Sequence, residues 1–150
     1  MVEQPESPLG TLPWLSPAER HQLLAEWNDT AAAGPEPPTL VDRFAVAVVG
    51  APDRLAVRWR EQSLSFEALD RRSDALARRL LAAGVEPDEP VALYLDRDPE
   101  TIAVMLAVWK AGGAYLPLDP TAPRERSASV LEDAGARVIV TRRALEPELA

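Results

Sequence analysis

The chain has 150 residues, of which 47% are hydrophobic, and a formal net charge of −8. This length and composition suit one globular domain and argue against wholesale disorder. The negative charge argues against nucleic-acid binding, because phosphate contacts need clustered Lys and Arg. The absence of cysteine excludes disulfides and thiolate metal sites, and no apolar run approaches the roughly 20 residues that span a bilayer. We therefore expect a cytoplasmic protein that binds neither nucleic acid nor membrane.

The first 38 residues are predicted to contain one helix and a linker. The sequence Ser16-Pro17-Ala18-Glu19 has the pattern of a capping box, which predicts a helix from about residue 17 to residue 27. Residues 28–38, NDTAAAGPEPP, have the composition of a linker. We therefore expect residues 1–38 to be a mobile N-terminus and linker with one helix, and a domain to begin at residue 39.

Residues 39–85 are predicted to form a helix, a hairpin and a longer helix. Thr39 can cap a helix that runs to about Val49. Residues 55–59 alternate between apolar and polar as a strand does, and residues 60–62 turn the chain into a short strand at 63–65. A clear amphipathic helix follows and ends at Gly84. Its inward-facing residues recur at spacings of three and four: Phe66, Leu69, Ser73, Leu76 and Leu80.

From residue 91 the pattern alternates between strand and helix. Strands are predicted at 91–95, 114–118 and 137–141, and helices at 99–111 and 124–134. Short loops join these elements, so the strands are expected to be parallel and linked by right-handed crossovers. The predicted fold class is α/β: a β-α-β-α-β parallel unit preceded by a short hairpin and helices.

The glycine pair Gly112-Gly113 could suggest a phosphate cradle. Phosphate sites form where a strand leads into a Gly-rich loop that opens a helix. Here the order is reversed, since the helix that begins at Asp98-Pro99-Glu100 ends at the glycines and a strand follows. We therefore interpret the pair as a helix C-cap, with Lys110 complementing the negative end of the helix dipole.

The loops after the predicted strands carry carboxylates where a nucleotide would need donors. They are residues 96–99 (DRDP) and 119–123 (DPTAP). A divalent metal at Asp96, Asp98 and Glu100 is conceivable, but Pro99 starts a helix there and we favour capping and solvated charge.

Other residues that can carry chemistry have structural explanations. The one histidine, His21, has no evident catalytic partner, so we interpret it as a surface residue. We expect the tryptophans to be packing residues: Trp14, Trp27, Trp59 and Trp109. The sequence therefore predicts a fold and no catalytic, cofactor-binding or metal-ligating residue.

Several segments resemble the adenylation domains of nonribosomal peptide synthetases, members of the adenylate-forming AMP-binding superfamily. Residues 64–85, LSFEALDRRSDALARRLLAAGV, and residues 90–120, PVALYLDRDPETIAVMLAVWKAGGAYLPLDP, are similar to the first two family signatures. Residues 123–141 resemble the helix and strand that follow. Residues 15–30, LSPAERHQLLAEWNDT, look like the linker between a condensation domain and an adenylation domain.

This resemblance implies that residues 39–150 form the N-terminal part of the large subdomain of an amino-acid-activating domain. The parent reaction would convert ATP and an amino acid to aminoacyl-adenylate and pyrophosphate with Mg²⁺, and then load a carrier-domain phosphopantetheine thiol. The implied partners are the rest of the adenylation domain, an upstream condensation domain and a downstream carrier domain. The family's phosphate loop, substrate pocket and catalytic lysine belong beyond residue 150, so the resemblance assigns no site residue and predicts an inactive chain.

Two alternatives stay open. One is a fragment of an acyl- or aryl-CoA ligase of the same superfamily. The other is a non-catalytic remnant or docking segment that packs on a condensation domain through residues 11–38. In each case a partial sheet should expose an apolar edge that an intact subdomain would cover.

Overall fold

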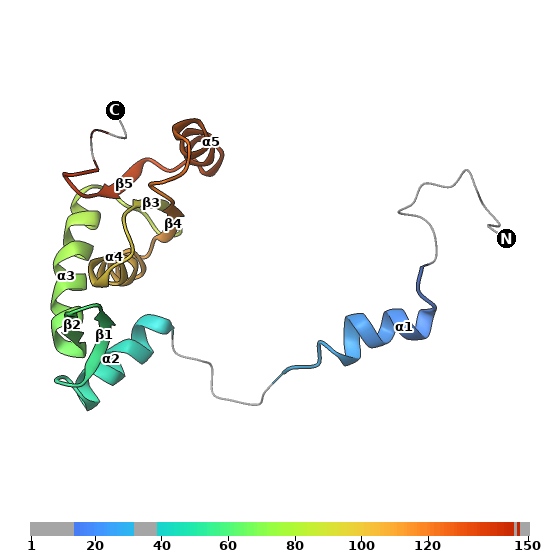
Figure 1. The fold of residues 1–150 in the computed structure, drawn as a ribbon. Coiled ribbons are helices and arrows are strands. Elements are labelled where there is room, and N and C mark those ends of the chain that lie inside the picture. Colours follow the sequence, from blue (N-terminus) through green and yellow to red (C-terminus); the bar gives the residue numbers. More distant parts are fainter. Residues whose placement is uncertain (1–13, 32–38, 146, 148–150) are drawn as a thin grey trace. The chain divides into compact units, whose positions relative to one another are not determined.

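The computed structural model describes residues 14–31, 39–145 and 147. They belong to two compact units, one within residues 1–37 and one within residues 38–150, and Figure 1 shows the elements of each. The expectation that residues 1–13 are mobile concerns residues outside the described ranges. So does most of the predicted linker, residues 32–38. No helix in the described ranges is long and apolar enough to cross a membrane.

The first unit contains the predicted helix with its capping box. Helix α1 (Pro17–His21) starts after Ser16, whose Oγ accepts the Glu19 backbone N–H at 3.2 Å, while Glu19 Oε2 accepts the Ser16 N–H at 2.8 Å. The chain then continues as a π-helical segment, Gln22–Glu26, in which no residue is buried. Trp14 and Trp27 are 73% and 65% exposed, so neither side chain is buried within this unit.

The second unit begins with a helix and a hairpin. Helix α2 (Leu40–Gly50) is capped by Thr39, whose Oγ1 accepts the Asp42 N–H at 3.2 Å. Strands β1 (Leu55–Trp59) and β2 (Gln62–Ser65) pair antiparallel, as predicted. The hydroxyl of Ser65 then caps the longest helix of the described chain, α3 (Phe66–Ala82). Three of the predicted inward-facing residues, Leu69, Ser73 and Leu80, are buried in it.

A parallel sheet follows, with the strand order β4-β3-β5. Its strands and connecting helices have these bounds: β3 (Pro90–Tyr94), α4 (Pro99–Lys110), β4 (Ala114–Leu118), α5 (Arg124–Ala134) and β5 (Val138–Thr141). The central strand β3 pairs with both neighbours, so that Val91 lies opposite Tyr115 on one side and Val138 on the other. The predicted α/β class and parallel β-α-β-α-β unit are confirmed.

The two faces of the sheet are covered by different helices (Figure 1). Val91, Leu93 and Leu95 of β3 and its following loop pack with residues of α3 and α4. The alternate residues of β3, Ala92 and Tyr94, pack with α5. Successive strand residues point to opposite faces, so α5 covers the face opposite to α3 and α4.

The turn from α4 into β4 is closed by Gly112 and Gly113. Gly112 has φ +85°, and the N–H groups of Gly112 and Gly113 donate to the carbonyls of Trp109 and Val108, both at 3.0 Å. These two bonds form a Schellman C-cap, which confirms the C-cap interpretation. A Cβ on Gly113 would lie 3.0 Å from the Glu89 carbonyl oxygen, so the backbones of two segments meet there without room for a side chain.

Lys110, in the last turn of α4, reaches across to α3. Its Nζ lies 2.6 Å from Asp70 Oδ1 and 2.6 Å from Asp74 Oδ1, and 5.5 Å from the centre of the Phe44 ring. The lysine side chain is only 12% exposed. The predicted helix-end position is confirmed, and the contact with two carboxylates one turn apart on α3 adds a charged clamp between the two helices.

Replacement of Gly113 by Ala should destabilise the chain. The nearest obstacle to the new methyl group is backbone, which must shift, so we expect a loss of about 1–3 kcal/mol in the free energy of unfolding measured with urea. Gly50→Ala is the matched control, because a Cβ there meets nothing within 4 Å and α2 would gain helix propensity. Equal stability of the two variants would show that the close approach at Gly113 is unimportant.

Lys110→Met should also destabilise the chain, because it leaves two carboxylates beside each other. Asp70 and Asp74 are partly exposed, which screens the loss, and we expect about 1–3 kcal/mol by urea unfolding. In the Lys110→Met variant, the further changes Asp70→Asn and Asp74→Asn should restore part of the lost free energy of unfolding. Arg71→Met, which breaks the exposed pair with Glu67, should cost under about 0.5 kcal/mol. Equal free energies of unfolding for Lys110→Met and Arg71→Met would show that the buried lysine contributes no more than the exposed ion pair.

Glu89 should make the chain less stable in acid. The Glu86 backbone N–H, at 2.9 Å, and then Arg137 Nε, at 3.0 Å, hold the pKa of Glu89 below its ordinary value. A depressed carboxyl pKa adds stability above pH of about 4 that is lost as the pH falls. In Glu89→Gln the urea midpoint should therefore be lower at pH 7 and should fall less between pH 7 and pH 3. Glu61→Gln, in the exposed hairpin turn, is the control, and an identical pH dependence in both variants would contradict the prediction.

Candidate functional site

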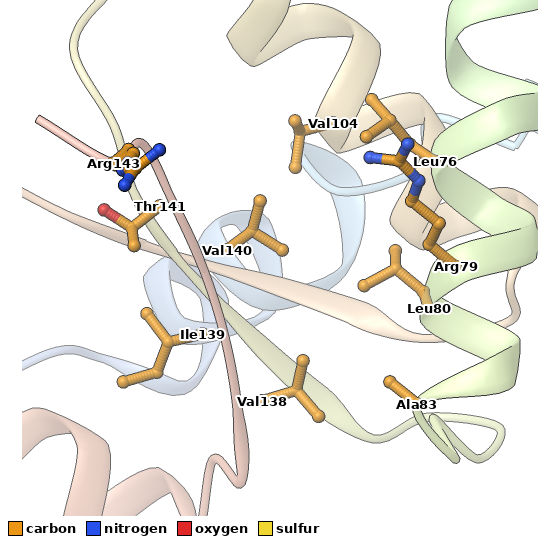
Figure 2. A pocket seen from close by; sticks show the side chains of 10 residues that line it. All are labelled: Leu76, Arg79, Leu80, Ala83, Val104, Val138, Ile139, Val140, Thr141 and Arg143. Atoms are coloured by element: carbon orange, nitrogen blue, oxygen red, sulfur yellow. The ribbon is translucent and has the colours of Figure 1, made fainter. Parts of the chain in front are cut away.

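An apolar hollow of about 560 Å³ lies between β5, α3 and α4. Figure 2 shows the side chains of Val138 and Val140 on one side and those of Leu80 and Ala83 on the other. Its other lining residues are Leu76, Arg79, Val104, Ile139, Thr141 and Arg143. The lining contains no carboxylate, histidine or thiol, so this hollow can bind apolar groups but has no general acid, base or nucleophile among these residues.

A second hollow of about 500 Å³ lies at the carboxyl ends of β3 and β4. Helices α4 and α5, which follow these two strands, cover opposite faces of the sheet, and ligands of open parallel sheets usually bind at such a point. The structure thus brings together the two loops that the sequence singled out. Their residues in this hollow are Asp96, Arg97, Asp119, Pro120 and Thr121.

The polar groups of this second hollow are largely engaged with one another. Asp119 Oδ1 accepts the Thr121 backbone N–H at 2.9 Å and the Thr121 hydroxyl at 2.8 Å, and these bonds hold the pKa of Asp119 below its ordinary value. The Thr101 hydroxyl donates to the Asp96 carbonyl oxygen at 2.5 Å. The two loops therefore carry carboxylates, as predicted, with the Asp119 carboxylate ionised and the Arg97 guanidinium in the same hollow.

Two of the three carboxylates considered for a metal, Asp98 and Glu100, are used in capping or ion pairs. Asp98 Oδ1 accepts the Thr101 N–H at 3.1 Å as the N-cap of α4, and Asp98 Oδ2 pairs with Arg142. Glu100 pairs with Arg72 at 3.0 Å. Within the part of the chain that the structure describes, no three Asp, Glu, His or Cys residues are grouped so that they could hold a metal ion. The capping interpretation of Asp98 is confirmed.

The structure also describes the other residues that the sequence singled out, His21, Trp109 and Trp59. His21 is exposed in the first unit, with Nε2 4.0 Å from Glu26 Oε1, as expected for a surface residue. Trp109 packs against Tyr115 at 5.1 Å between ring centres, which confirms its packing role. Trp59 is 42% exposed, and the Arg60 guanidinium lies 5.6 Å from the centre of its ring. The prediction that Trp59 is a packing residue was wrong.

Sequence reasoning did not find the apolar hollow beside β5 or the clamp around Lys110. The clamp had a signal, since Asp70 and Asp74 are four residues apart and therefore share one face of a helix. The one sequence signal for the hollow was the apolar run of β5, and such a run does not indicate what lies beside the strand.

Comparison with known proteins identifies related chains. Residues 44–150 match the family model described as AMP-binding enzyme. The chain is 44% identical over 144 residues to chondramide synthase cmdD of Chondromyces crocatus, covering 94% of this chain and 4% of that protein. It is 41% identical over 150 residues to tyrocidine synthase 3 of Brevibacillus parabrevis, covering all of this chain and 2% of that protein. The chain thus spans only a small part of these curated relatives.

Solved structures have the same fold. The nonribosomal peptide synthetase FmoA3 superimposes with a TM-score of 0.72 and 34% identity over 79% of this chain and 13% of that one. The N-terminal subdomain of Klebsiella oxytoca NpsA superimposes with a TM-score of 0.64 and 28% identity over 68% of this chain and 27% of that one. The family model, the sequence relatives and the fold agree, and the chain belongs to the AMP-binding enzyme family, in which it matches part of a nonribosomal peptide synthetase adenylation domain.

Proposed function

We propose that residues 39–150 are the N-terminal part of the large subdomain of an amino-acid-activating adenylation domain. The observation that carries this proposal is the similarity of nearly the whole chain, at 44% and 41% identity, to the synthases of chondramide and tyrocidine. The parent protein would form aminoacyl-adenylate and pyrophosphate from an amino acid and ATP with Mg²⁺, then load a phosphopantetheine thiol on a carrier domain. Residues 1–38 would connect this domain to an upstream condensation domain, and the parent protein would be cytoplasmic.

Within the described residues, the loops at the carboxyl ends of β3 and β4 offer carboxylates where ATP phosphates would need donors, which supports a structural role for this segment. Phosphates need backbone N–H groups at the start of a helix that follows a strand. At α4 that position is taken by the Asp98 carboxylate, which accepts the Thr101 N–H and pairs with Arg142. At α5 the preceding loop carries the ionised Asp119. We expect the isolated chain to show no amino-acid-dependent ATP–pyrophosphate exchange.

A chimera tests the proposal. The segment of tyrocidine synthase 3 that matches this chain, over 150 residues, is replaced by this chain in the otherwise unchanged protein. Because the family resemblance places the substrate pocket outside this segment, the chimera should keep exchange within about tenfold of the parent and the parent's amino-acid preference. A chimera that also carries Gly113→Leu is the control for a misfolded insert and should lose exchange.

Three outcomes would overturn parts of this proposal. A folded chimera without exchange would mean that the chain is not an adenylation-domain scaffold and would favour the remnant or docking alternative. A changed amino-acid preference would place substrate-selecting residues within the chain. Exchange by the isolated chain would contradict its inactivity.

A further inference from the structure

The chain that leaves β5, residues 141–145, lies against the carboxyl end of the central strand β3, and we call these residues the strap. The Thr141 hydroxyl donates to the carbonyl oxygen of Tyr94, the last residue of β3, at 3.0 Å. The Leu145 N–H donates to the Arg142 carbonyl oxygen at 2.9 Å, which turns the chain. Leu145 then packs on the buried cluster around Tyr94, on the face of the sheet that α5 covers.

One ion pair connects the strap to the opposite face of the sheet. Arg142 pairs with Asp98 Oδ2 at the start of α4, and the Asp98 side chain is only 15% exposed. The other carboxylate oxygen of Asp98, Oδ1, accepts the Thr101 N–H at 3.1 Å as the N-cap of α4. A single carboxylate therefore holds both the first turn of α4 and the strap.

The strap also has a connection to the second hollow, at the carboxyl ends of β3 and β4. Leu118 belongs to the cluster on which Leu145 packs, and it also lines this hollow. The Tyr94 hydroxyl donates to the carbonyl oxygen of Pro120, another lining residue, at 3.2 Å. Displacement of Leu145 would therefore remove packing from the residues that hold the loop after β4.

The strap has fewer buried contacts than the strand beneath it. None of its five residues, 141–145, is fully buried, whereas Ala92 and Tyr94 of β3 are 0% and 3% exposed. Segments with few buried apolar contacts open locally while the rest of a domain stays folded. In such a segment a single charge pair makes up a large part of the interaction that opposes opening.

We infer that the strap is a latch that opens and closes over the end of β3 while the rest of the unit stays folded, and that the Asp98–Arg142 pair sets the closed population. Opening separates Leu145 from the Tyr94 cluster and loosens the loop at residues 119–121. Salt screens the attraction between the two charges, so higher ionic strength favours the open state.

Variants that separate the ion pair from the helix cap test the inference on the full 150-residue chain. Asp98→Asn keeps an N-cap, because Asn caps helices as well as Asp does, but it loses the charge that Arg142 contacts. We expect Asp98→Asn and Arg142→Met each to speed hydrogen exchange of the Leu145 N–H about fivefold, measured by NMR, with an unchanged urea midpoint. The double variant should exchange no faster than the faster single variant, because both changes remove one interaction.

Two controls match these variants in charge. Glu100→Gln removes a carboxylate from the same turn of α4 and breaks its pair with Arg72, and Arg143→Met removes a cation from the strap itself. Each should leave the exchange rate of the Leu145 N–H within about twofold of the unaltered chain, because the Asp98–Arg142 pair stays intact. Equal acceleration in Asp98→Asn and Glu100→Gln would overturn the inference.

Salt and a second amide complete the test. Raising NaCl from about 0.05 M to about 0.5 M should speed exchange of the Leu145 N–H in the unaltered chain and much less in Asp98→Asn. The Thr121 N–H, which donates to Asp119 Oδ1, should exchange faster in Asp98→Asn if the strap holds this loop, and an unchanged rate would refute the connection. Exchange of the Leu145 N–H only through global unfolding, in step with urea stability in every variant, would show that no latch exists. None of these outcomes depends on ATP–pyrophosphate exchange, so a failure here is distinct from a failure of the chimera.

Discussion

The close passage of backbone at Gly113 sets the arrangement of the second unit. The chain must leave α4, reverse, and enter β4 directly beside the loop before β3, and the Glu89 carbonyl oxygen leaves no room for a side chain there. The same oxygen accepts the Ala114 N–H at 2.9 Å, which starts the β3–β4 pairing. This contact therefore fixes where β4 begins beside β3, in the register that places Ala114 opposite Pro90.

Local sequence predicted the elements well because local interactions decide them. Helices α2 and α4 begin where their predicted capping residues, Thr39 and Asp98, place them. Helices α3 and α4 both end at a glycine with φ +85°, Gly84 and Gly112. Strand order was harder. Strand β5 pairs with β3 rather than with β4. This choice depends on which helix covers which face of the sheet, and local sequence patterns do not predict it.

Side-chain roles were less predictable than backbone, and the errors have a common cause. Trp27 and Trp59 are apolar by type, but apolar character indicates burial only where a partner surface exists. Lys110 shows the opposite case, a charged residue that is largely buried because Asp70 and Asp74 approach it from another helix. Both outcomes depend on residues far away in the sequence, as does the hollow beside β5.

The carboxylates that follow strands β3 and β4 are used to fix their own loops. Asp98 and Asp119 each satisfy backbone donors of their own loop, which fixes the loops but removes those donors from any ligand. Substitution of Asp98 or Asp119 should therefore act chiefly through the stability of these loops, because each carboxylate holds backbone N–H groups in place.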